Sequence, residues 1–293
     1  MGERVRLDSE LVRQGLARSR RHAAELIGAG RVSIDGAPTA KSSTALEPGQ
    51  VLSIEERPGD GPEYASRAGH KLAGALDALG PQGPAVQGRI CLDAGASTGG
   101  FTDVLLRRGA AHVLAVDVGH DQLVPALRAD PRVTVREGVN VRHLQAGEFD
   151  PAPELVVGDL SFISLTLVLP ALLAVAAPGA DLFVLVKPQF EVGRELLGTG
   201  GVVRSAGLRA QAVLAVARSA AGLGLTTRAV VASALPGPSG NVEYFVWLVV
   251  DPAATVAGLV PGPADGDLIA LVDRAVDEGP TGAGTGWTSG GDQ

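Results

Sequence analysis

Strand-like and helix-like segments alternate along this chain from about residue 89 to residue 251. Apolar runs such as "RICLDAG", "HVLAVDV" and "LFVLVK" are separated by stretches whose apolar residues recur at helical spacing. Repeated units of this kind build a mostly parallel sheet with helices on both faces. We therefore expect an α/β fold with a doubly wound sheet over most of the chain.

The cellular context is indicated by the cysteine usage and by the N-terminal residues. The chain has one cysteine, Cys91, which excludes a disulfide framework and a cysteine-based zinc site. Because Cys91 lies inside an apolar strand pattern, we expect a buried structural thiol. The N-terminal segment "MGERVRLDSE" is too charged for a signal peptide. We expect a cytoplasmic protein.

One segment has the length and composition to raise the question of a membrane span. Residues 160–180 include no charged side chain and are about long enough to cross a bilayer. The segment contains Pro170 and Pro178, however, and charged strand-like segments flank it closely. We interpret it as a loop followed by a buried helix, and we expect no stable membrane association.

Charge is distributed unevenly. The formal net charge is −7, but the segment from Arg4 to Arg31 has seven arginines against three acids, whereas the residues from Asp251 onward have seven acids against one arginine. A basic N-terminal segment on an acidic chain suggests a surface that meets a polyanion.

The first fifty-odd residues are predicted to form a small module of two helices and a short sheet. Asp8 is the expected N-cap of a helix that stops at Gly15, and Ser19 is the expected cap of a second helix that ends near Gly28. Strands are expected over "RVSI" and "QVLSI", with a turn at Asp35-Gly36.

The pattern "RLDSELVRQGLARSRRHAAELIGAGRVSIDG" closely resembles the S4 RNA-binding domain. In that family the second helix and its N-terminal flank present arginines to the RNA backbone, and guanidinium groups suit phosphate recognition. The alternative is a solvated basic face without a ligand. The predicted RNA-binding residues are Arg6, Arg18, Arg20, Arg21 and Lys41.

A glycine-rich loop, "LDAGASTGGFTD", follows the first strand of the α/β region and opens the next helix. Its glycines allow a tight turn and a close approach by a ligand. Asp117 ends the next strand, where a ribose-hydroxyl acceptor lies in doubly wound nucleoside-binding sheets. Together these features resemble motifs I and II of S-adenosylmethionine-dependent methyltransferases. The predicted cofactor-binding residues are Asp93, Gly95, Ala96, Ser97, Gly99, Gly100, Phe101 and Asp117.

Four charged residues are expected at one edge of the sheet. Asp159 and Lys187 each follow a strand, and Lys71 lies in the first turn of the helix "SRAGHKLAGALD". Glu243 precedes the last strand and reaches the same edge if that strand is antiparallel to its neighbours. Taken singly, each would more often be a solvated structural charge. As a group they favour a catalytic cleft at the carboxyl edge of the sheet.

The chemistry that fits these residues is methylation of a ribose 2′-hydroxyl. A lysine acts as a base only when neutral, so its pKa must fall through burial or a neighbouring cation. The second lysine, still charged, would stabilise the developing alkoxide, while the carboxylates hold the geometry. Which lysine is the base is left open.

The motifs "SRAGHKL", "CLDAGASTGGFTD", "DLSFIS", "LVKPQFEVG" and "LPGPSGNVEYF", behind the S4-like module, resemble the TlyA family of ribosomal RNA 2′-O-methyltransferases, also labelled hemolysin A. The resemblance implies a Rossmann-like class I methyltransferase domain of the FtsJ-like type, preceded by a small α+β S4 domain. It implies a catalytic tetrad of Lys71, Asp159, Lys187 and Glu243.

The resemblance also implies a substrate and partners. The family methylates cytidine ribose in 16S and/or 23S ribosomal RNA, using S-adenosylmethionine and no metal. The expected partner is ribosomal RNA within ribosomal subunits. Two alternatives come from other classes of protein: a membrane-active hemolysin and a non-catalytic RNA-binding protein.

The predicted domain limits are 1–57 for the S4 domain, 58–66 for a linker, 67–280 for the methyltransferase domain and 281–293 for a disordered tail. Related actinobacterial members carry an Arg-x-Trp-Val segment before "SR", where this chain has Pro62, Glu63, Tyr64 and Ala65. If that segment couples cofactor binding to domain docking in the related proteins, this chain lacks the residues that would do so.

Overall fold

The computed structural model describes residues 5–14, 16–17, 20–47, 49–55, 64–250 and 265–279, without the side chains of residues 21, 22, 194 and 265. The chain divides into two compact units, and the boundary between them falls after Glu63. Most of the predicted linker and the predicted tail lie outside the described residues.

The N-terminal unit contains two helices, α1 (Leu7–Arg13) and α2 (Arg20–Gly28), and five short strands. The strands are β1 (Val5–Arg6), β2 (Val32–Ile34), β3 (Ala37–Pro38), β4 (Ala45–Leu46) and β5 (Leu52–Ile54). They form a two-stranded sheet, β1-β4, and a three-stranded sheet, β3-β2-β5. The apolar faces of both helices pack on these strands around Leu7, Leu11 and Ile27, which are fully buried.

Both predicted helices and both predicted strands of this unit are present, but Asp8 is not a cap. The N-cap of α1 is Arg6, and Asp8 is the second residue of the helix. The helix starts directly from β1 because the backbone N–H groups of Leu7 and Asp8 donate to the carbonyls of Thr44 and Ser42. The Asp8 carboxylate is turned toward arginine side chains instead. Ser19, the predicted cap of α2, lies outside the described residues.

The C-terminal unit has a seven-stranded sheet in the order β11-β12-β10-β9-β6-β7-β8. The strands are β6 (Ile90–Ala94), β7 (His112–Asp117), β8 (Val133–Glu137), β9 (Leu155–Gly158), β10 (Asp181–Val186), β11 (Leu225–Ala232) and β12 (Tyr244–Val250). The α-helices are α3 (Arg67–Leu79), α4 (Gly100–Arg107), α5 (Pro125–Arg128), α6 (Leu169–Val175), α7 (Pro188–Glu191), α8 (Ala206–Gly222) and α10 (Asp265–Glu278). Short 3-10 turns are η1 (Gly80–Gln82), η2 (Val141–His143), η3 (Leu165–Leu167) and η4 (Arg194–Leu196).

The sheet is doubly wound, as predicted. From β6 the chain adds β7 and β8 on one side, and it then returns to add β9 and β10 on the other, all in parallel. β12 pairs antiparallel with β10 and with β11. The prediction that the strand after Glu243 is antiparallel is therefore confirmed. The strand order reverses between β6 and β9, which is where ligands bind in open α/β sheets.

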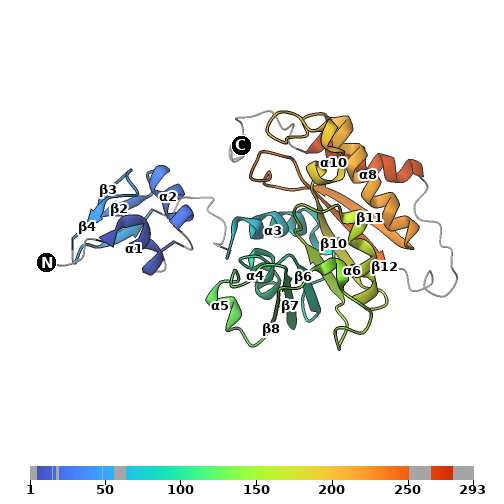
Figure 1. The fold of residues 1–293 in the computed structure, drawn as a ribbon, viewed down its shortest axis with the longest axis horizontal. Coiled ribbons are helices and arrows are strands. Elements are labelled where there is room, and N and C mark those ends of the chain that lie inside the picture. Colours follow the sequence, from blue (N-terminus) through green and yellow to red (C-terminus); the bar gives the residue numbers. More distant parts are fainter. Residues whose placement is uncertain are drawn as a thin grey trace. The chain divides into compact units, whose positions relative to one another are not determined.

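Alternate residues of the central strands enter two separate cores. In β10, Leu182 and Val184 pack with α6, α8 and α10, whereas Phe183 and Leu185 pack with α3, α4 and α5. Figure 1 shows these two helix groups on opposite faces of the sheet. Burial on both faces explains why β10 reads as a continuous apolar run.

Two local predictions need correction. The single helix expected within residues 160–180 is divided into η3 and α6, because Ser164 caps the first turn and Pro170 allows a new start. Lys71 is the fifth residue of α3, not a member of its first turn. Directly after β10, Pro188 begins helix α7, with Lys187 as the N-cap. None of the helices that the structure describes is both long and apolar enough to span a bilayer.

Helices α3 and α4 approach each other closely at two glycines. A Cβ added to Gly100 would lie 2.2 Å from Ser66 Oγ and 2.9 Å from the backbone nitrogen of Gly69. A Cβ added to Gly69 would lie 2.5 Å from Tyr64 Cβ. These distances are below van der Waals contact, so the packing of α3 on the start of α4 requires glycine at both positions.

We therefore expect Gly100→Ala to lower the unfolding free energy of the C-terminal unit by about 1–3 kcal/mol, the usual cost of overpacking. Gly222→Ala is the matched control, because Gly222 ends α8 and an added Cβ there would have nothing within 4 Å. The control should be neutral or stabilising by up to about 1 kcal/mol. Thermal unfolding followed by circular dichroism compares the two. Equal midpoints would contradict the close-packing argument.

Candidate active site

The predicted cofactor loop, Gly95 to Gly99, connects β6 to α4. Its backbone is fixed by hydrogen bonds from the N–H groups of Gly95 and Ala96 to the carbonyl of Val116 in β7. Gly95 has φ +90°, and a Cβ there would meet the Asp159 carbonyl oxygen at 3.0 Å. The glycine therefore allows the loop to lie directly against the end of β9, at the point where the strand order reverses.

Asp117 lies at the end of β7, as predicted, and its carboxylate holds two loops in place. Oδ2 accepts from the backbone N–H of Ser97 at 2.8 Å, and Oδ1 accepts from that of Gly119 at 2.6 Å. A carboxylate has about four acceptor positions, so further hydrogen bonds to a ligand remain possible.

A cavity of about 510 Å³ opens beside this loop. Gly95, Ser97 and Asp117 line it from the predicted set, and Gln122 and Asn140 add polar groups that sequence reasoning missed. The wall also contains Val118 and Phe162, which are 67% and 90% exposed. Apolar walls with a few fixed polar groups are typical of small-molecule sites.

Asp93 lies beneath the loop and is fully buried. Oδ2 accepts a hydrogen bond from Thr102 Oγ1 at 2.7 Å, while Oδ1 has no partner among the described residues. Burial raises the pKa of Asp93 to about 7, against the opposing effect of the Thr102 hydrogen bond. Neither Asp93 nor Gly99 lines the cavity. Gly99 instead packs on Leu127, whose Cδ1 would be 2.3 Å from an added Cβ.

The four predicted catalytic residues form two ion pairs. Lys71 Nζ lies 2.6 Å from Glu243 Oε2, and these residues are 5% and 0% exposed. Lys187 Nζ lies 2.6 Å from Asp159 Oδ1 and donates to Ser161 Oγ at 2.7 Å. Buried charges of this kind persist only when they are paired.

Sheet register explains why these residues meet. Val184 in β10 pairs with Gly158 in parallel β9, so Asp159 and Lys187 follow neighbouring strands at one edge. Val186 pairs with Tyr244 in antiparallel β12, which brings Glu243 to the same edge from the opposite chain direction.

A second cavity, of about 260 Å³, joins the lysines to the glycine loop. It is lined by Lys71, Lys187 and Asp159 together with loop residues, and by Pro236 and Pro238 on the other side. Glu243 lies behind Lys71 and is not part of the lining. We call this hollow the lysine cleft. The predicted loop residues that line it are Gly95, Ala96, Ser97, Gly100 and Phe101.

Ser161 is the functional residue that sequence reasoning missed most clearly. It borders both cavities and contacts Lys187 directly. It stands two residues beyond Asp159, and that short spacing from a predicted catalytic residue was an available signal. Asp159 also borders both cavities. The two hollows thus adjoin at the end of β9.

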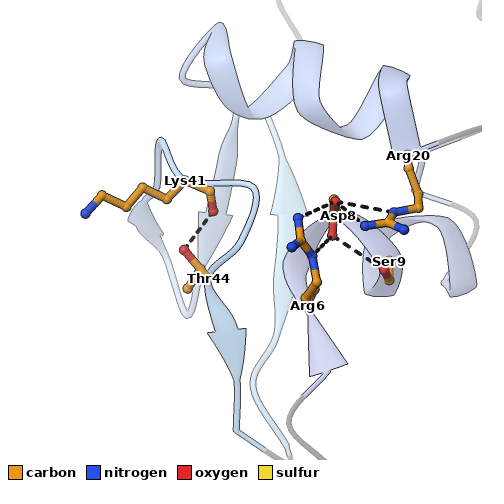
Figure 2. A network of polar contacts seen from close by, with 6 residues as sticks. All are labelled: Arg6, Asp8, Ser9, Arg20, Lys41 and Thr44. Carbon is orange, nitrogen blue, oxygen red and sulfur yellow. Dashed lines mark hydrogen bonds and ion pairs between the residues drawn. The ribbon is translucent and has the colours of Figure 1, made fainter.

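The predicted RNA-binding residues lie in the N-terminal unit. Figure 2 shows Arg6 and Arg20 converging on Asp8, and the Lys41 side chain extending away from its surroundings. Arg6, Arg20 and Lys41 are exposed. Arg18 and the side chain of Arg21 lie outside the described part of the chain.

Both units match known protein families. The S4 domain family matches residues 5–52, and the FtsJ-like methyltransferase family matches residues 64–250. A Mycobacterium tuberculosis protein named 16S/23S rRNA (cytidine-2′-O)-methyltransferase TlyA is 54% identical over 96% of this chain and 100% of its own length. Hemolysin A of Brachyspira hyodysenteriae is 34% identical over 84% of this chain and all of that protein.

Among solved structures, a Streptococcus thermophilus protein described as a hemolysin superimposes with a TM-score of 0.71 at 34% identity. The match covers 94% of this chain and 96% of that one. Since the FtsJ-like family matches more than half of the chain and the TlyA relative is 54% identical over nearly the whole of it, the chain belongs to the TlyA family of FtsJ-like methyltransferases.

Proposed function

We propose that this methyltransferase acts on ribosomal RNA and transfers a methyl group from S-adenosylmethionine to the 2′-hydroxyl of a cytidine ribose, in 16S and/or 23S RNA. The observation that carries the proposal is the lysine cleft, where two buried lysines, each paired with a carboxylate, open onto the glycine loop. The activity for which the Mycobacterium tuberculosis relative is named supports the choice of substrate.

The residues around the larger cavity fit S-adenosylmethionine. Gly95 leaves room that a side chain would fill, and Asp117 keeps acceptor positions for ribose hydroxyls. Asp93 offers, near the same loop, a buried oxygen that no described residue contacts by a hydrogen bond. The cofactor supplies a methyl group already activated on a sulfonium. We infer that Gly95, Ser97 and Asp117 bind it in the larger cavity and that Ala96, Gly100 and Phe101 contact it from the adjoining lysine cleft, with Asp93 and Gly99 supporting the loop.

The proton of the 2′-hydroxyl would be removed by the tetrad of Lys71, Asp159, Lys187 and Glu243. The 2′-hydroxyl is a weak acid, so a positioned neutral amine must accept its proton, and a second cation must stabilise the oxygen left behind. Both lysines are buried, and each Nζ is fixed at the cleft by its carboxylate partner.

The two units would have different roles. We propose that residues 1–57 dock on RNA through Arg6, Arg18, Arg20, Arg21 and Lys41, that 58–66 form a linker, and that 67–280 perform the transfer. The S4 match and the basic charge of the N-terminal segment support this division. The substrate would be met within ribosomal subunits in the cytoplasm.

The proposal is tested by mapping 2′-O-methyl groups in ribosomal RNA from a strain with this gene and from a strain lacking it. We expect a cytidine whose 2′-O-methyl group is lost with the gene and restored by wild-type protein. Identical methylation maps in both ribosomal subunits would reject the proposed substrate.

Replacing Lys187 tests the cleft directly. Lys187→Met keeps the length of the side chain but removes the amine, and we expect the methyl-transfer rate to fall by roughly 10²- to 10⁴-fold, the usual contribution of a positioned acid or base. Arg228→Met, which removes an exposed cation from β11, is the control and should retain activity. Single-turnover transfer of labelled methyl groups measures both. S-adenosylmethionine binding should change far less than the rate.

The base can then be identified with arginine, which keeps its positive charge but does not lose a proton. Lys71→Arg and Lys187→Arg are compared in the same assay. The variant at the base position should be as inactive as its methionine counterpart, while the variant at the other position should keep more activity. Full activity in both variants would exclude either lysine as the base.

The buried Asp93 predicts a dependence of stability on pH. Its pKa is about 7 in the folded protein and 3.8 in the reference state, so between these values the folded state binds more protons than the unfolded state. The unfolding free energy therefore falls as pH rises through this window. Compared with Asp93→Asn, which does not titrate, wild type should lose roughly 2–4 kcal/mol between about pH 4 and pH 8. If the unfolding free energies of the two proteins differ by the same amount at every pH in this range, the raised pKa of Asp93 is contradicted.

A further inference from the structure

Asp8 is an acidic residue at the centre of a surface that is expected to meet a polyanion. Its carboxylate binds the guanidinium groups of both Arg6 and Arg20, which are predicted RNA-binding residues (Figure 2). By charge alone, an acid in this place should oppose RNA binding. The contacts point to a different effect.

The geometry places the carboxylate beneath the two arginines. Arg6 Nε and Nη2 donate to Asp8 Oδ1 and Oδ2, each at 3.0 Å, in a two-pronged contact. Arg20 Nη2 donates to Oδ2 at 3.1 Å, and its Nε donates to the same oxygen at 3.4 Å. The Asp8 side chain is 7% exposed, whereas those of Arg6 and Arg20 are 51% and 61% exposed. The acid is covered while the guanidinium groups face outward.

Each guanidinium keeps donors for a second partner. Arginine has five N–H donors, and the bonds to Asp8 use only one edge of each group. The remaining edge has the fork geometry that matches a phosphate. Because both Nη2 atoms contact the same oxygen, the two guanidinium groups are held close together on one carboxylate.

Without the carboxylate, this arrangement would be costly. Two guanidinium groups repel each other at this separation, and long exposed side chains lose rotamer freedom when a ligand fixes them. The shared carboxylate offsets the repulsion and fixes both side chains before RNA arrives. The two arginines hold the pKa of Asp8 well below its ordinary value, so the carboxylate stays charged at neutral pH.

We propose that Asp8 is a positioning residue for RNA docking, and that it holds Arg6 and Arg20 together as one receptor for a backbone phosphate. The inference rests on the proposed function, because it assumes that this unit docks on RNA. The inference predicts a change in RNA affinity opposite to the one expected from net charge alone. Removing this acid weakens RNA binding, although the surface becomes more positive.

The experiment compares Asp8→Asn with Glu10→Gln in the full-length protein. Glu10 is the matched control: it is another covered acid in α1, and its partners, Arg13 and Gln14, lie outside the predicted RNA-binding set. Both changes remove one negative charge. Binding to purified 23S ribosomal RNA is measured by filter retention at several salt concentrations between about 50 and 200 mM.

We expect Asp8→Asn to bind roughly three- to tenfold more weakly than wild type, the effect of releasing two rotamer-rich side chains. Glu10→Gln should bind as tightly as wild type or up to a few-fold more tightly. In methyl-transfer assays the Asp8 variant should raise the KM for RNA and leave kcat unchanged. Affinity equal to or greater than wild type for Asp8→Asn would overturn the proposal.

A second background separates positioning from unfolding. In Arg6→Gln/Arg20→Gln protein there is no arginine pair to position, so adding Asp8→Asn should cause no further loss of affinity. If it does cause a further loss, Asp8 acts through the stability of the unit and the positioning role is wrong.

The same background distinguishes failure of this inference from failure of RNA docking itself. If Arg6→Gln/Arg20→Gln binds RNA like wild type with the same salt dependence, the docking role of these arginines is rejected, and the inference falls with it. If that variant binds more weakly but Asp8→Asn does not, docking stands and only the role of Asp8 is rejected.

Discussion

Two lysine side chains are buried at one edge of a sheet, each in contact with a carboxylate, and this constraint governs the C-terminal unit. Lys71 and Lys187 are 5% and 7% exposed, so each needs a carboxylate in contact. Glu243 and Asp159 meet that need only in the observed register of β12, β10 and β9. A slip of one residue in β12 would move Glu243 to the other face of the sheet and leave Lys71 unpaired. The ion pairs and the strand pairing therefore depend on each other.

The reversal of strand order supplies the rest of the site. Strands β6 and β9 are neighbours, and the loops that follow them diverge. The ends of the two strands remain joined because the N–H of Asp159 donates to the carbonyl of Ala94. Gly95 lets the cofactor loop lie against this junction. As a result Asp159 and Ser161 border both cavities, and a methyl donor in one would face an acceptor in the other. Proximity of this kind provides much of the rate gain in a transfer between two bound molecules.

How much of this could be predicted from the sequence depends on the range of the interaction. The strands, the glycine loop and the edge positions of Asp159, Lys187 and Glu243 follow from local apolar patterns and from the rule that parallel strands end at one edge. The two-residue strands β1, β3 and β4 were missed, because so short a segment shows no period. Asp8 is not the predicted cap because the start of α1 is set by backbone contacts of Leu7 and Asp8 with Thr44 and Ser42, which lie far along the chain. The Ser161 contact with Lys187 joins residues twenty-six positions apart, so only the closeness of Ser161 to Asp159 in the sequence could have indicated it.

The distribution of basic residues separates the two kinds of chemistry. Only three of the 25 basic residues are lysines, and two of these, Lys71 and Lys187, lie in the cleft. Arginine does not lose its proton in proteins, so it provides permanent charge for phosphates but no base. Of the two cations, only a lysine can be the base in the proposed methyl transfer, whereas an arginine stays charged, as a phosphate-binding group should. Under the proposed function, a carboxylate fixes each lysine amine at the cleft in one unit, and the buried carboxylate of Asp8 orients the arginines in the other. The same pairing of acid and cation would then serve proton transfer in one unit and phosphate recognition in the other, and the choice between lysine and arginine would decide which.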